Sequence, residues 1–392
     1  MRPDDLKQAF TGLFCATPVV SSTVGRLLIA GGGTGGHLFP GIAIAREFMA
    51  RNAQNAVLFV STGNPFERNT LSRAGFALET VSVAGIKGRG IWQKFKSFAL
   101  IPLGIVQSGW IIRNFKPDLV LGVGSYAAGP VVLTAWMTGI PVVLHEQNIL
   151  PGITNRALAR FARRIYVSFE NTAGRFDTGK VRLTGNPVRR EILQPPATED
   201  CKDKGRPEQA PVLNILIAGG SQGAHAINMA VVDALGLIRQ KDRIRVVHQT
   251  GAADEDRVRA AYAAQGVTAV VEAFFDDMDR RYRRADLIIC RAGATTVAEI
   301  TAVGKAALFI PFPFAADDHQ RLNAEALAER DAAEMIEERH LTAAKLAERI
   351  DRFATDQTTL DRMAEQARKL GRPEAARLIV DDCYTFITGN RS

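Results

Sequence analysis

A glycine-rich segment that ends in a histidine is the strongest chemical signal in the sequence. It reads GGGTGGH over residues 31–37 and directly follows a short apolar run at Arg26–Ala30. Glycine lets the backbone approach a phosphate closely, and the N-terminus of the helix that follows supplies N–H groups and a partial positive charge. The order of strand, glycine turn and helix therefore predicts an anion-binding site.

The same glycines formally match a dinucleotide-binding fingerprint, because Gly31, Gly33 and Gly36 satisfy G-x-G-x-x-G. That site needs an acidic residue at the end of the second strand to bind a ribose. The expected second strand, residues 57–61, is followed by Thr62 and Gly63 and offers no carboxylate. The sequence therefore disfavours an NAD or FAD site. A plain turn is also a poor explanation, because five glycines in six residues cost chain entropy.

Three more junctions between an apolar run and a helix pattern carry polar groups. They read GVGSY at 122–126, GGSQG at 219–223 and RAGATTVAE at 291–299. Glu299 could accept both vicinal hydroxyls of a ribose through its two oxygens; the alternative is a glutamate that stabilises the first turn of its helix. Because ligands bind beyond the carboxyl ends of parallel strands, these turns predict a ligand site, shared if the two halves of the chain face each other.

Two residues are candidates for proton transfer. His37 is the candidate general base, because histidine exchanges protons near neutral pH; the alternative is a histidine that only caps or packs at the turn. Glu146 is the rival base, and it could equally be a structural carboxylate.

Short β-branched runs alternate with helix patterns throughout, which predicts βαβ units, parallel sheets and helices on both faces. Strands are expected at 26–30, 57–61, 78–83, 119–123, 142–145 and 165–168 in the first half, and at 213–218, 244–249, 269–271, 287–290 and 307–310 in the second. We therefore predict an α/β protein with two Rossmann-like domains whose parallel sheets face a cleft between the domains.

Composition shifts divide the chain. A stretch rich in proline and charge at 194–211 reads as a linker or exposed loop between an N-terminal domain, 25–193, and a C-terminal domain, 212–370. Residues 1–24 read as a loosely ordered extension. Residues 371–392 read as a closing helix, set off by Gly371 and Pro373, that we expect to pack back on the first domain.

Composition and charge also limit the class of protein. With 392 residues and 46% hydrophobic residues, each half can bury a core. A net charge of +8 favours anionic partners such as phosphates, nucleic acid or an acidic membrane surface, although no nucleic-acid-binding motif is visible. The four cysteines are far apart, which fits a reducing cytosol, and we identify neither a signal peptide nor an apolar run long enough to span a bilayer.

One segment favours a membrane surface. Residues 85–96 combine basic and bulky apolar side chains, and Phe98, Leu103 and Trp110 continue the apolar pattern. Basic side chains with tryptophan and phenylalanine suit an anionic membrane surface. The alternative is a core helix that follows a basic loop.

Seven motifs occur in order along the chain: GGGTGGHLFPG, GVGSYAAGP, HEQN, GNPVR, GGSQGA, FFDDM and RAGATTVAEI. Together they resemble the MurG family of N-acetylglucosaminyltransferases, from about residue 26 to residue 336. The resemblance implies the GT-B fold of two Rossmann-like domains. It also implies inverting transfer of N-acetylglucosamine from UDP-GlcNAc to the C4 hydroxyl of lipid I, undecaprenyl-diphospho-N-acetylmuramoyl-pentapeptide, to give lipid II for peptidoglycan.

The resemblance also implies a set of substrate-binding residues. It places Thr34, Gly35, Gly36 and Asn148 at the donor sugar and diphosphate, and Arg189 and Ser221 at the nucleotide or phosphates. Contacts to the base and ribose are expected from Phe275, at the uracil, and from Ala294, Thr295, Thr296, Val297, Ala298 and Glu299, at phosphate and ribose. Gln320 is placed at the sugar hydroxyls, and Gly124, Ser125 and Tyr126 on the acceptor side. Three positions depart from the family pattern. Phe275 replaces a smaller aliphatic residue, Ser125 replaces a common glycine, and His319 stands where a glutamine is frequent.

A metal is not expected. Asp277 and Asp279 form a D-x-D pair, as in single-domain, metal-using glycosyltransferases, but the charges crowded over residues 276–284 favour a solvated helix start. The helix N-termini of the second domain would meet the leaving diphosphate instead. The sequence therefore predicts a reaction without a cofactor.

The resemblance further implies partners, location and cellular role. UDP-GlcNAc, a lipid-linked muramoyl-pentapeptide, an anionic membrane surface and cell-wall synthesis proteins are the expected partners, and nucleic acid is not. The expected location is peripheral, on the cytoplasmic face of the plasma membrane, with roles in cell shape and division. Two alternatives remain: another GT-B enzyme such as a UDP-GlcNAc 2-epimerase, and a non-catalytic nucleotide-binding module.

Overall fold

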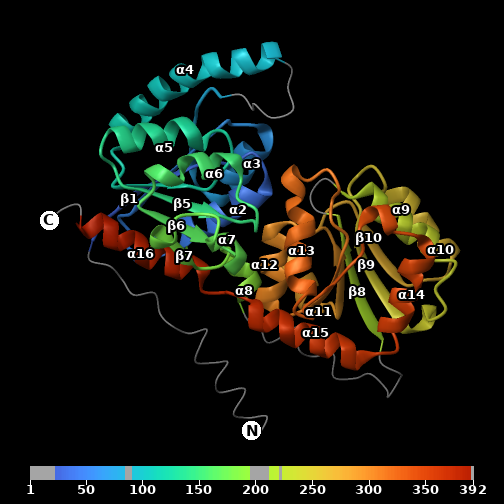
Figure 1. Ribbon diagram of the computed structural model, residues 1–392. Coiled ribbons are helices and arrows are strands. Elements are labelled where there is room, and N and C mark those ends of the chain that lie inside the picture. Colours follow the sequence, from blue (N-terminus) through green and yellow to red (C-terminus); the bar gives the residue numbers. More distant parts are fainter. Residues whose placement is uncertain (1–22, 84–90, 195–211, 220–222, 390–392) are drawn as a thin grey trace, which may run out of the picture. The chain divides into compact units, whose positions relative to one another are not determined.

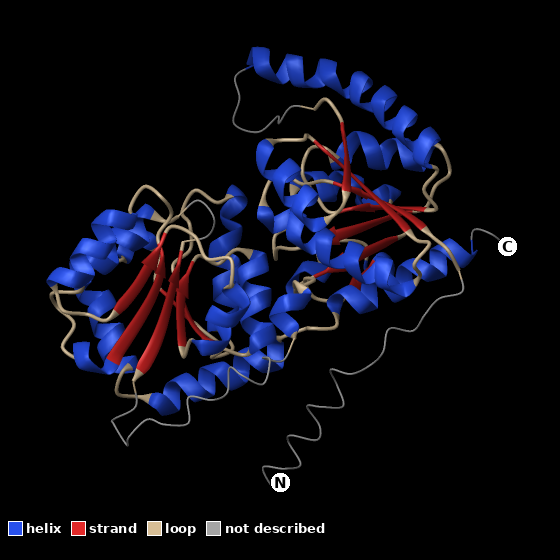
Figure 2. Cartoon of the chain, turned by 180° about the vertical axis from the view of Figure 1, so that it is seen from behind, coloured by secondary structure: helices blue, strands red, loops and turns tan. Residues whose placement is uncertain are grey.

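The computed structural model describes residues 23–83, 91–194, 212–219 and 223–389, which form two compact units (Figure 1). Unit 1 holds the described residues up to Gln147, the segment Pro151–Arg190 and the chain from Glu374. Unit 2 holds Asn148–Leu150 and the described part of Glu191–Pro373. In both units strands lie between helices (Figure 2).

Unit 1 is built on a seven-stranded parallel sheet in the order β3-β2-β1-β4-β5-β6-β7. Its strands are β1 (Arg26–Ala30), β2 (Ala56–Ser61), β3 (Ala77–Thr80), β4 (Leu119–Gly122), β5 (Val142–Glu146), β6 (Arg164–Val167) and β7 (Val181–Leu183). The sequence predicted the first six. It missed β7, because three residues are too few to show a periodic pattern.

Helices cover both faces of this sheet. They are α2 (Gly35–Arg51), α3 (Pro65–Ala74), α4 (Ile91–Phe115), α5 (Ala128–Met137), α6 (Ile153–Leu158), α7 (Glu170–Ala173) and α16 (Ala375–Gly389), with 3-10 turns η1 (Ala159–Phe161) and η2 (Thr178–Lys180). Alternate residues of β1 face opposite sides, as in any strand. Leu28 belongs to a core with Val131 of α5, and Leu27 to a core with Ile44 of α2 and Ile379 of α16. Each face of the sheet therefore has its own core.

Unit 2 is built on a six-stranded parallel sheet in the order β10-β9-β8-β11-β12-β13. Its strands are β8 (Leu213–Ala218), β9 (Ile244–Gln249), β10 (Ala269–Glu272), β11 (Leu287–Cys290), β12 (Ala306–Phe309) and β13 (Glu334–Met335). The sequence predicted all but β13, which has only two residues and no recognisable pattern. The two parallel-sheet units confirm the predicted fold class.

The helices of unit 2 lie on both sides of its sheet, with α9, α10 and α14 on one side and α12 and α13 on the other (Figure 1). They are α9 (His225–Ala234), α10 (Glu255–Ala264), α11 (Met278–Arg284), α12 (Ala294–Val303), α13 (His319–Ala328), α14 (Ala343–Phe353) and α15 (Gln357–Leu370). The described residues of the unit also form the 3-10 turns η4 (Lys241–Arg243), η5 (Ala316–Asp318) and η6 (Glu338–His340). Helix α8 (Arg190–Leu193) lies where the chain passes from unit 1 to unit 2.

Each sheet has one topological switch point, where the strand order reverses. In unit 1 it lies between β1 and β4, and in unit 2 between β8 and β11. Ligands of open parallel sheets bind outside the carboxyl ends of the strands at such a point. All four predicted glycine or polar junctions follow these four strands.

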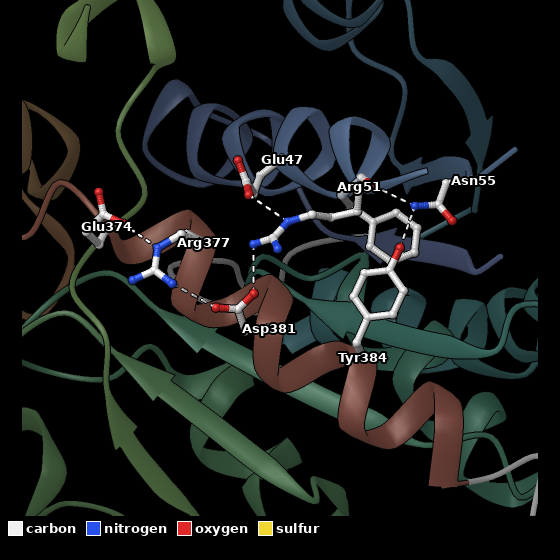
Figure 3. A network of polar contacts seen from close by, with 8 residues as sticks. Glu47, Arg51, Asn55, Glu374, Arg377, Asp381 and Tyr384 are labelled. Atoms are coloured by element: carbon white, nitrogen blue, oxygen red, sulfur yellow. Dashed lines mark hydrogen bonds and ion pairs between the residues drawn. The ribbon is translucent and has the colours of Figure 1, made fainter. Parts of the chain in front are cut away.

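The C-terminal helix α16 belongs to unit 1, where polar contacts hold it. Arg51 of α2 bonds both Glu47 and Asp381, at 2.9 and 2.7 Å (Figure 3). Asn55 donates to the Tyr384 hydroxyl at 2.7 Å. Asp382 accepts from Arg164 at 3.0 Å, Arg182 at 2.8 Å and the Tyr166 hydroxyl at 3.0 Å.

We expect Asp382→Asn to destabilise unit 1 far more than Asp381→Asn does. The Asp382 side chain is 7% exposed and that of Asp381 is 40% exposed. Replacing the buried carboxylate puts an amide N–H group among donors, at a cost of about 2–3 kcal/mol. Asp381 is partly exposed, and its buried partner Arg51 keeps the bond to Glu47, so that replacement should cost about 1 kcal/mol or less. Urea unfolding monitored by circular dichroism measures both changes. Equal losses would show that α16 is not anchored through Asp382.

Several sequence predictions fall outside the described residues. These are the N-terminal extension up to residue 22, the linker over residues 195–211, residues 85–90 of the basic segment, Ser221, Cys15 and Cys201. Among the described residues, Cys290 and Cys383 are buried free thiols. The described residues contain no helix long and apolar enough to cross a membrane.

Candidate functional site

The first glycine turn is held by the protein itself. The Gly31 amide donates to the Val60 carbonyl at 3.0 Å, and the Gly32 amide donates to Ser125 Oγ at 3.2 Å. The Gly33 amide donates to Glu67 Oε1. These three bonds therefore fix the shape of the turn. Thr34 is the N-cap of α2, and Gly35 and Gly36 are its first residues.

Glu67 holds the first glycine turn in place, a role that the sequence alone did not predict. It is completely buried, and besides Gly33 it accepts from the Ser61 hydroxyl, from Thr62 Oγ1 at 3.1 Å and from the Asn64 amide at 2.9 Å. A Cβ atom on Gly32 would lie 2.3 Å from Glu67 Oε1, so only glycine fits there. The capping box that Asn64 forms with Glu67 was the available signal, but it indicates only a helix start.

His37 lies where the β1 and β4 junctions meet. Its Nδ1 atom is 2.9 Å from Gln147 Oε1, and a Cβ atom on Gly124 would lie 3.1 Å from its Cε1 atom. Ser125 adopts φ +72°, a left-handed conformation that favours glycine. Its hydroxyl compensates by accepting from the Gly32 amide, which explains how serine is tolerated at this left-handed position. Tyr126 is the exposed neighbour of this junction.

Glu146, the rival base, has the contacts of a structural carboxylate. It is buried at the end of β5, and its Oε2 atom accepts from the Gly152 amide at 3.1 Å and from Asn155 Nδ2 at 2.8 Å. Those bonds fix the loop before α6. This geometry favours His37 over Glu146 as the base.

The predicted Asn148 lies with unit 2, and Asn323 explains why. Asn323 of α13 is completely buried; its Oδ1 atom accepts from the Ile149 amide at 3.2 Å, and its Nδ2 atom donates to Asn148 Oδ1 at 3.2 Å. The same nitrogen donates to the Ala292 carbonyl at 3.2 Å. Asn323 thereby joins Asn148 to the β11–α12 junction. No local pattern in the sequence identifies it, because its partners are 31 to 175 residues away.

The β8 junction depends on two glycines. A Cβ atom on Gly219 would lie 2.2 Å from the Ala224 amide nitrogen, and one on Gly223, at φ +73°, would lie 2.5 Å from the Thr250 carbonyl oxygen. Ser221 lies between them, outside the described residues. Neighbouring backbone atoms therefore leave no room for a side chain at Gly219 or at Gly223.

A buried polar chain holds the start of α9 beside this turn. Asn228 donates to the Thr250 carbonyl at 2.9 Å and to Asp254 Oδ2 at 2.8 Å. His248 Nε2 lies 3.0 Å from Asn228 Oδ1. Burial lowers the pKa of His248 to about 3, so the ring is neutral at neutral pH. Burial acts to raise the pKa of Asp254, but bonds from Asn228 and His225 outweigh it and hold that pKa below its ordinary value.

The β11 junction brings the predicted ribose and phosphate residues onto one helix. Gly293 caps α12, whose first residues are Ala294, Thr295, Thr296, Val297 and Ala298. Glu299 is buried and lies beyond the first turn, which contains no acidic residue. The helix-dipole explanation for Glu299 is therefore weak, because that effect is confined to the first turn. Burial raises the pKa of the neighbouring Cys290 well above its ordinary value, so this thiol is inert.

Three other predicted residues are tied to their surroundings. Phe275 is buried, with its amide donating to Gln249 Oε1 at 3.1 Å. Gln320 Oε1 accepts from the Phe312 amide at 3.0 Å, so any bond that this side chain donates must come from its NH₂ group. His319 Nδ1 lies 2.6 Å from the Ala316 carbonyl, so His319 closes the turn before α13.

The remaining predictions concern Arg189 and the D-x-D pair. The Arg189 guanidinium lies over the Phe39 ring of α2, 5.2 Å from its centre. Asp277 accepts from Arg281 at 3.0 Å, and Asp279 pairs with Arg283, both four residues apart on α11. These pairs are typical of a charged helix face. No cluster of metal-ligating side chains occurs among the residues that the structure describes.

The comparisons with known proteins agree with this fold. The glycosyltransferase family 28 N-terminal domain matches residues 27–167, and the C-terminal domain of that family matches residues 214–379. The chain is 48% identical over 375 residues to the UDP-N-acetylglucosamine–N-acetylmuramyl-(pentapeptide) pyrophosphoryl-undecaprenol N-acetylglucosamine transferase of Pelobacter propionicus, which covers 92% of this chain and 99% of that one. The Geobacter sulfurreducens enzyme of the same name is 48% identical over 358 residues, 91% and 97% of the two chains.

Solved structures give the same result. Acinetobacter baumannii MurG superposes with a TM-score of 0.74 at 32% identity, over 91% of this chain and 98% of that one. UDP-GlcNAc 2-epimerase from Neisseria meningitidis, bound to UDP-GlcNAc, has a TM-score of 0.63 at 14% identity, over 92% and 100%, which shows the fold alone.

Two parallel-sheet domains, each with glycine junctions at its switch point, define a glycosyltransferase of the GT-B fold. Sequence identity then separates this chain from the epimerases that share the fold. The chain belongs to the MurG family of N-acetylglucosaminyltransferases.

Proposed function

We propose that this protein transfers N-acetylglucosamine from UDP-GlcNAc to lipid I, giving lipid II and UDP, with His37 as the general base. The observation that supports this reaction is the 48% identity, over almost the whole length of both chains, to relatives named for this transfer. The position of His37 at the switch point of unit 1 supports its role. The epimerase alternative has only a shared fold in its favour, and the binding-module alternative has no specific observation.

The reaction needs two things from the protein: a base for the acceptor hydroxyl and stabilisation of the leaving diphosphate. In the proposed step, the C4 oxygen of the acceptor bonds to the anomeric carbon as the bond to the phosphate oxygen breaks, with inversion. UDP keeps the electron pair, and the hydroxyl proton goes to His37. Arg189, Ser221 and the first residues of α12 are proposed to meet the diphosphate, with Glu299 on the ribose and Gln320 on the sugar.

An assay with UDP-[¹⁴C]GlcNAc and a short-chain lipid I analogue tests the transfer. We expect label in a disaccharide-linked lipid and one UDP for each sugar moved. Release of a C2 epimer without transfer, or tight UDP binding without turnover on any muramoyl lipid, would contradict the proposal.

The proposal includes no metal, because the diphosphate would be met by helix N-termini and Arg189. We expect EDTA to leave kcat within about twofold, since no step is assigned to a Lewis acid. The matched control adds Mg²⁺ back after EDTA. A loss of turnover in EDTA that Mg²⁺ restores would overturn the metal-free mechanism.

A membrane surface on unit 1 forms the second part of the proposal. Leu103, Val106 and Trp110 lie three and four residues apart on α4 and are 45%, 69% and 62% exposed. Residues at this spacing share one face of a helix. Trp136 and Met137, at the end of the neighbouring helix α5, are also exposed. An acceptor dissolved in a bilayer requires such a surface, which would place the enzyme peripherally on the cytoplasmic face.

We expect the triple variant Leu103→Ser, Val106→Ser, Trp110→Ser to bind anionic vesicles at least about tenfold more weakly. Three apolar side chains that become partly buried in lipid on binding contribute several kcal/mol. Leu237→Ser is the matched control, since Leu237 is 52% exposed but lies in unit 2. Sedimentation with phosphatidylglycerol vesicles at low salt measures both. Unchanged binding of the triple variant would remove α4 from the membrane surface.

A further inference from the structure

Three polar side chains in unit 1 form a chain between two backbone carbonyl oxygens. Gln147 Nε2 lies 2.9 Å from the Val123 carbonyl oxygen, and Gln147 Oε1 lies 2.9 Å from His37 Nδ1. Gln147 Nε2 also lies 3.0 Å from His145 Nδ1, and His145 Nε2 lies 3.4 Å from the Gly185 carbonyl oxygen. Gln147 and His145 are buried. The two carbonyl oxygens can only accept hydrogen bonds, so they determine which nitrogen atoms in this chain carry a proton.

The orientation of the Gln147 amide follows first. The atom beside the Val123 carbonyl must donate, so it is the amide nitrogen; a second carbonyl oxygen, that of His145, lies 3.4 Å from the same atom. The amide oxygen therefore faces His37. Because an amide oxygen only accepts, His37 Nδ1 must carry a proton.

His145 supplies the second constraint. Its Nδ1 atom faces a donor and must accept, so its single proton lies on Nε2, towards the Gly185 carbonyl. Burial lowers the pKa of His145 to about 4, with a bond to Gly185 acting in the opposite direction and His37 adding to the lowering. His145 is thus neutral at neutral pH. The lone pair on its Nδ1 atom prevents the Gln147 side-chain amide group from flipping.

We propose that Gln147, held by His145 and the Val123 carbonyl, is a positioning residue that fixes the proton of neutral His37 on Nδ1 and leaves Nε2 as the basic atom. The functional meaning of this inference rests on the proposed role of His37 as base. In the transfer step the acceptor O–H bond breaks and the proton goes to Nε2. The resulting imidazolium keeps its Nδ1–H bond to Gln147 Oε1.

Nuclear magnetic resonance reads this proton directly. In the full chain labelled with ¹⁵N-histidine, long-range ¹H–¹⁵N spectra distinguish Nδ1–H from Nε2–H for each of the six histidines. The variants His37→Gln and His145→Gln assign the two signals. We expect Nδ1–H at His37 and Nε2–H at His145 above pH 7. Nε2–H at His37 in the wild type would overturn the inference.

Three variants test the role of Gln147. Gln147→Leu removes the acceptor, so His37 should lose its preference for Nδ1–H and kcat should fall at least about tenfold, with KM for UDP-GlcNAc within about threefold. Gln147→Glu keeps an oxygen facing His37, and as the protonated acid it can still donate to the Val123 carbonyl, so it should restore the Nδ1–H signal. Gln107→Leu is the control, because Gln107 exchanges hydrogen bonds with Ser82, away from His37, and its replacement should leave both signals and kcat unchanged.

The outcomes separate this inference from the proposed function. An unchanged His37 signal in Gln147→Leu overturns the positioning role. If the signal changes as expected but His37→Ala keeps full turnover, the base assignment fails while the tautomer assignment stands. If Gln147→Leu unfolds, the wild-type spectrum and Gln147→Glu still decide the question.

Discussion

His37→Ala should lose turnover by about 10²- to 10⁴-fold while binding UDP within about threefold of the wild type, because a positioned general base contributes that much to a proton-transfer step. His37 lies in unit 1 at the start of α2, whereas Glu299 and the first residues of α12, proposed for the ribose and the diphosphate, lie in unit 2. Removing the imidazole therefore leaves the donor site intact. Steady-state assays give kcat and KM, and calorimetric titration gives the dissociation constant for UDP.

Glu146→Gln is the control for this experiment. Glu146 is tied to Gly152 and Asn155, so its replacement should lower stability but leave kcat of the folded protein within about tenfold. The opposite pattern, with turnover lost in folded Glu146→Gln and retained in His37→Ala, would assign the base to Glu146.

Glu299→Ala should raise KM for UDP-GlcNAc and the dissociation constant for UDP by about 10- to 100-fold, because hydrogen bonds to a charged group contribute about 1.5–3 kcal/mol. The effect on kcat should be small, since the ribose does not change during the transfer. Glu299→Gln keeps one acceptor oxygen and should be intermediate. Calorimetric titration with UDP measures all three proteins.

Deoxyuridine diphosphate makes this test specific, because it lacks the 2′-hydroxyl. The wild type should bind it at least about tenfold more weakly than UDP, and Glu299→Ala should bind the two equally, since the partner of that hydroxyl is gone. A variant that still discriminates between the two nucleotides would show that Glu299 does not bind the ribose.

The fold could largely be predicted from the sequence, because strands buried on both faces show as uninterrupted apolar runs. The run 213–218 became β8 with unchanged bounds, whereas β7 and β13, with three and two residues, left no such signal. The glycine junctions were equally visible, since tight turns demand residues without a Cβ atom. Gly219 and Gly223 would each collide with backbone atoms if they carried one.

The side chains that hold these junctions could not be predicted. Glu67, Asn323 and Gln147 are buried polar residues whose partners lie up to 175 residues away in the chain, so periodicity and spacing do not reveal these contacts. The first junction also shows what a motif omits. Its pattern suggests a phosphate site, yet three glycine amides are taken up by Val60, Ser125 and Glu67. A motif gives the backbone shape, and only the tertiary contacts give the partners of its donors.

A crystal structure of the protein with UDP tests the central claim most directly. The account predicts UDP at the carboxyl ends of β8 and β11 in unit 2, with the diphosphate at the start of α12 and both ribose hydroxyls donating to the Glu299 carboxylate. Nucleotide bound at the carboxyl end of β1 in unit 1, or bound in unit 2 with its ribose away from Glu299, would contradict it.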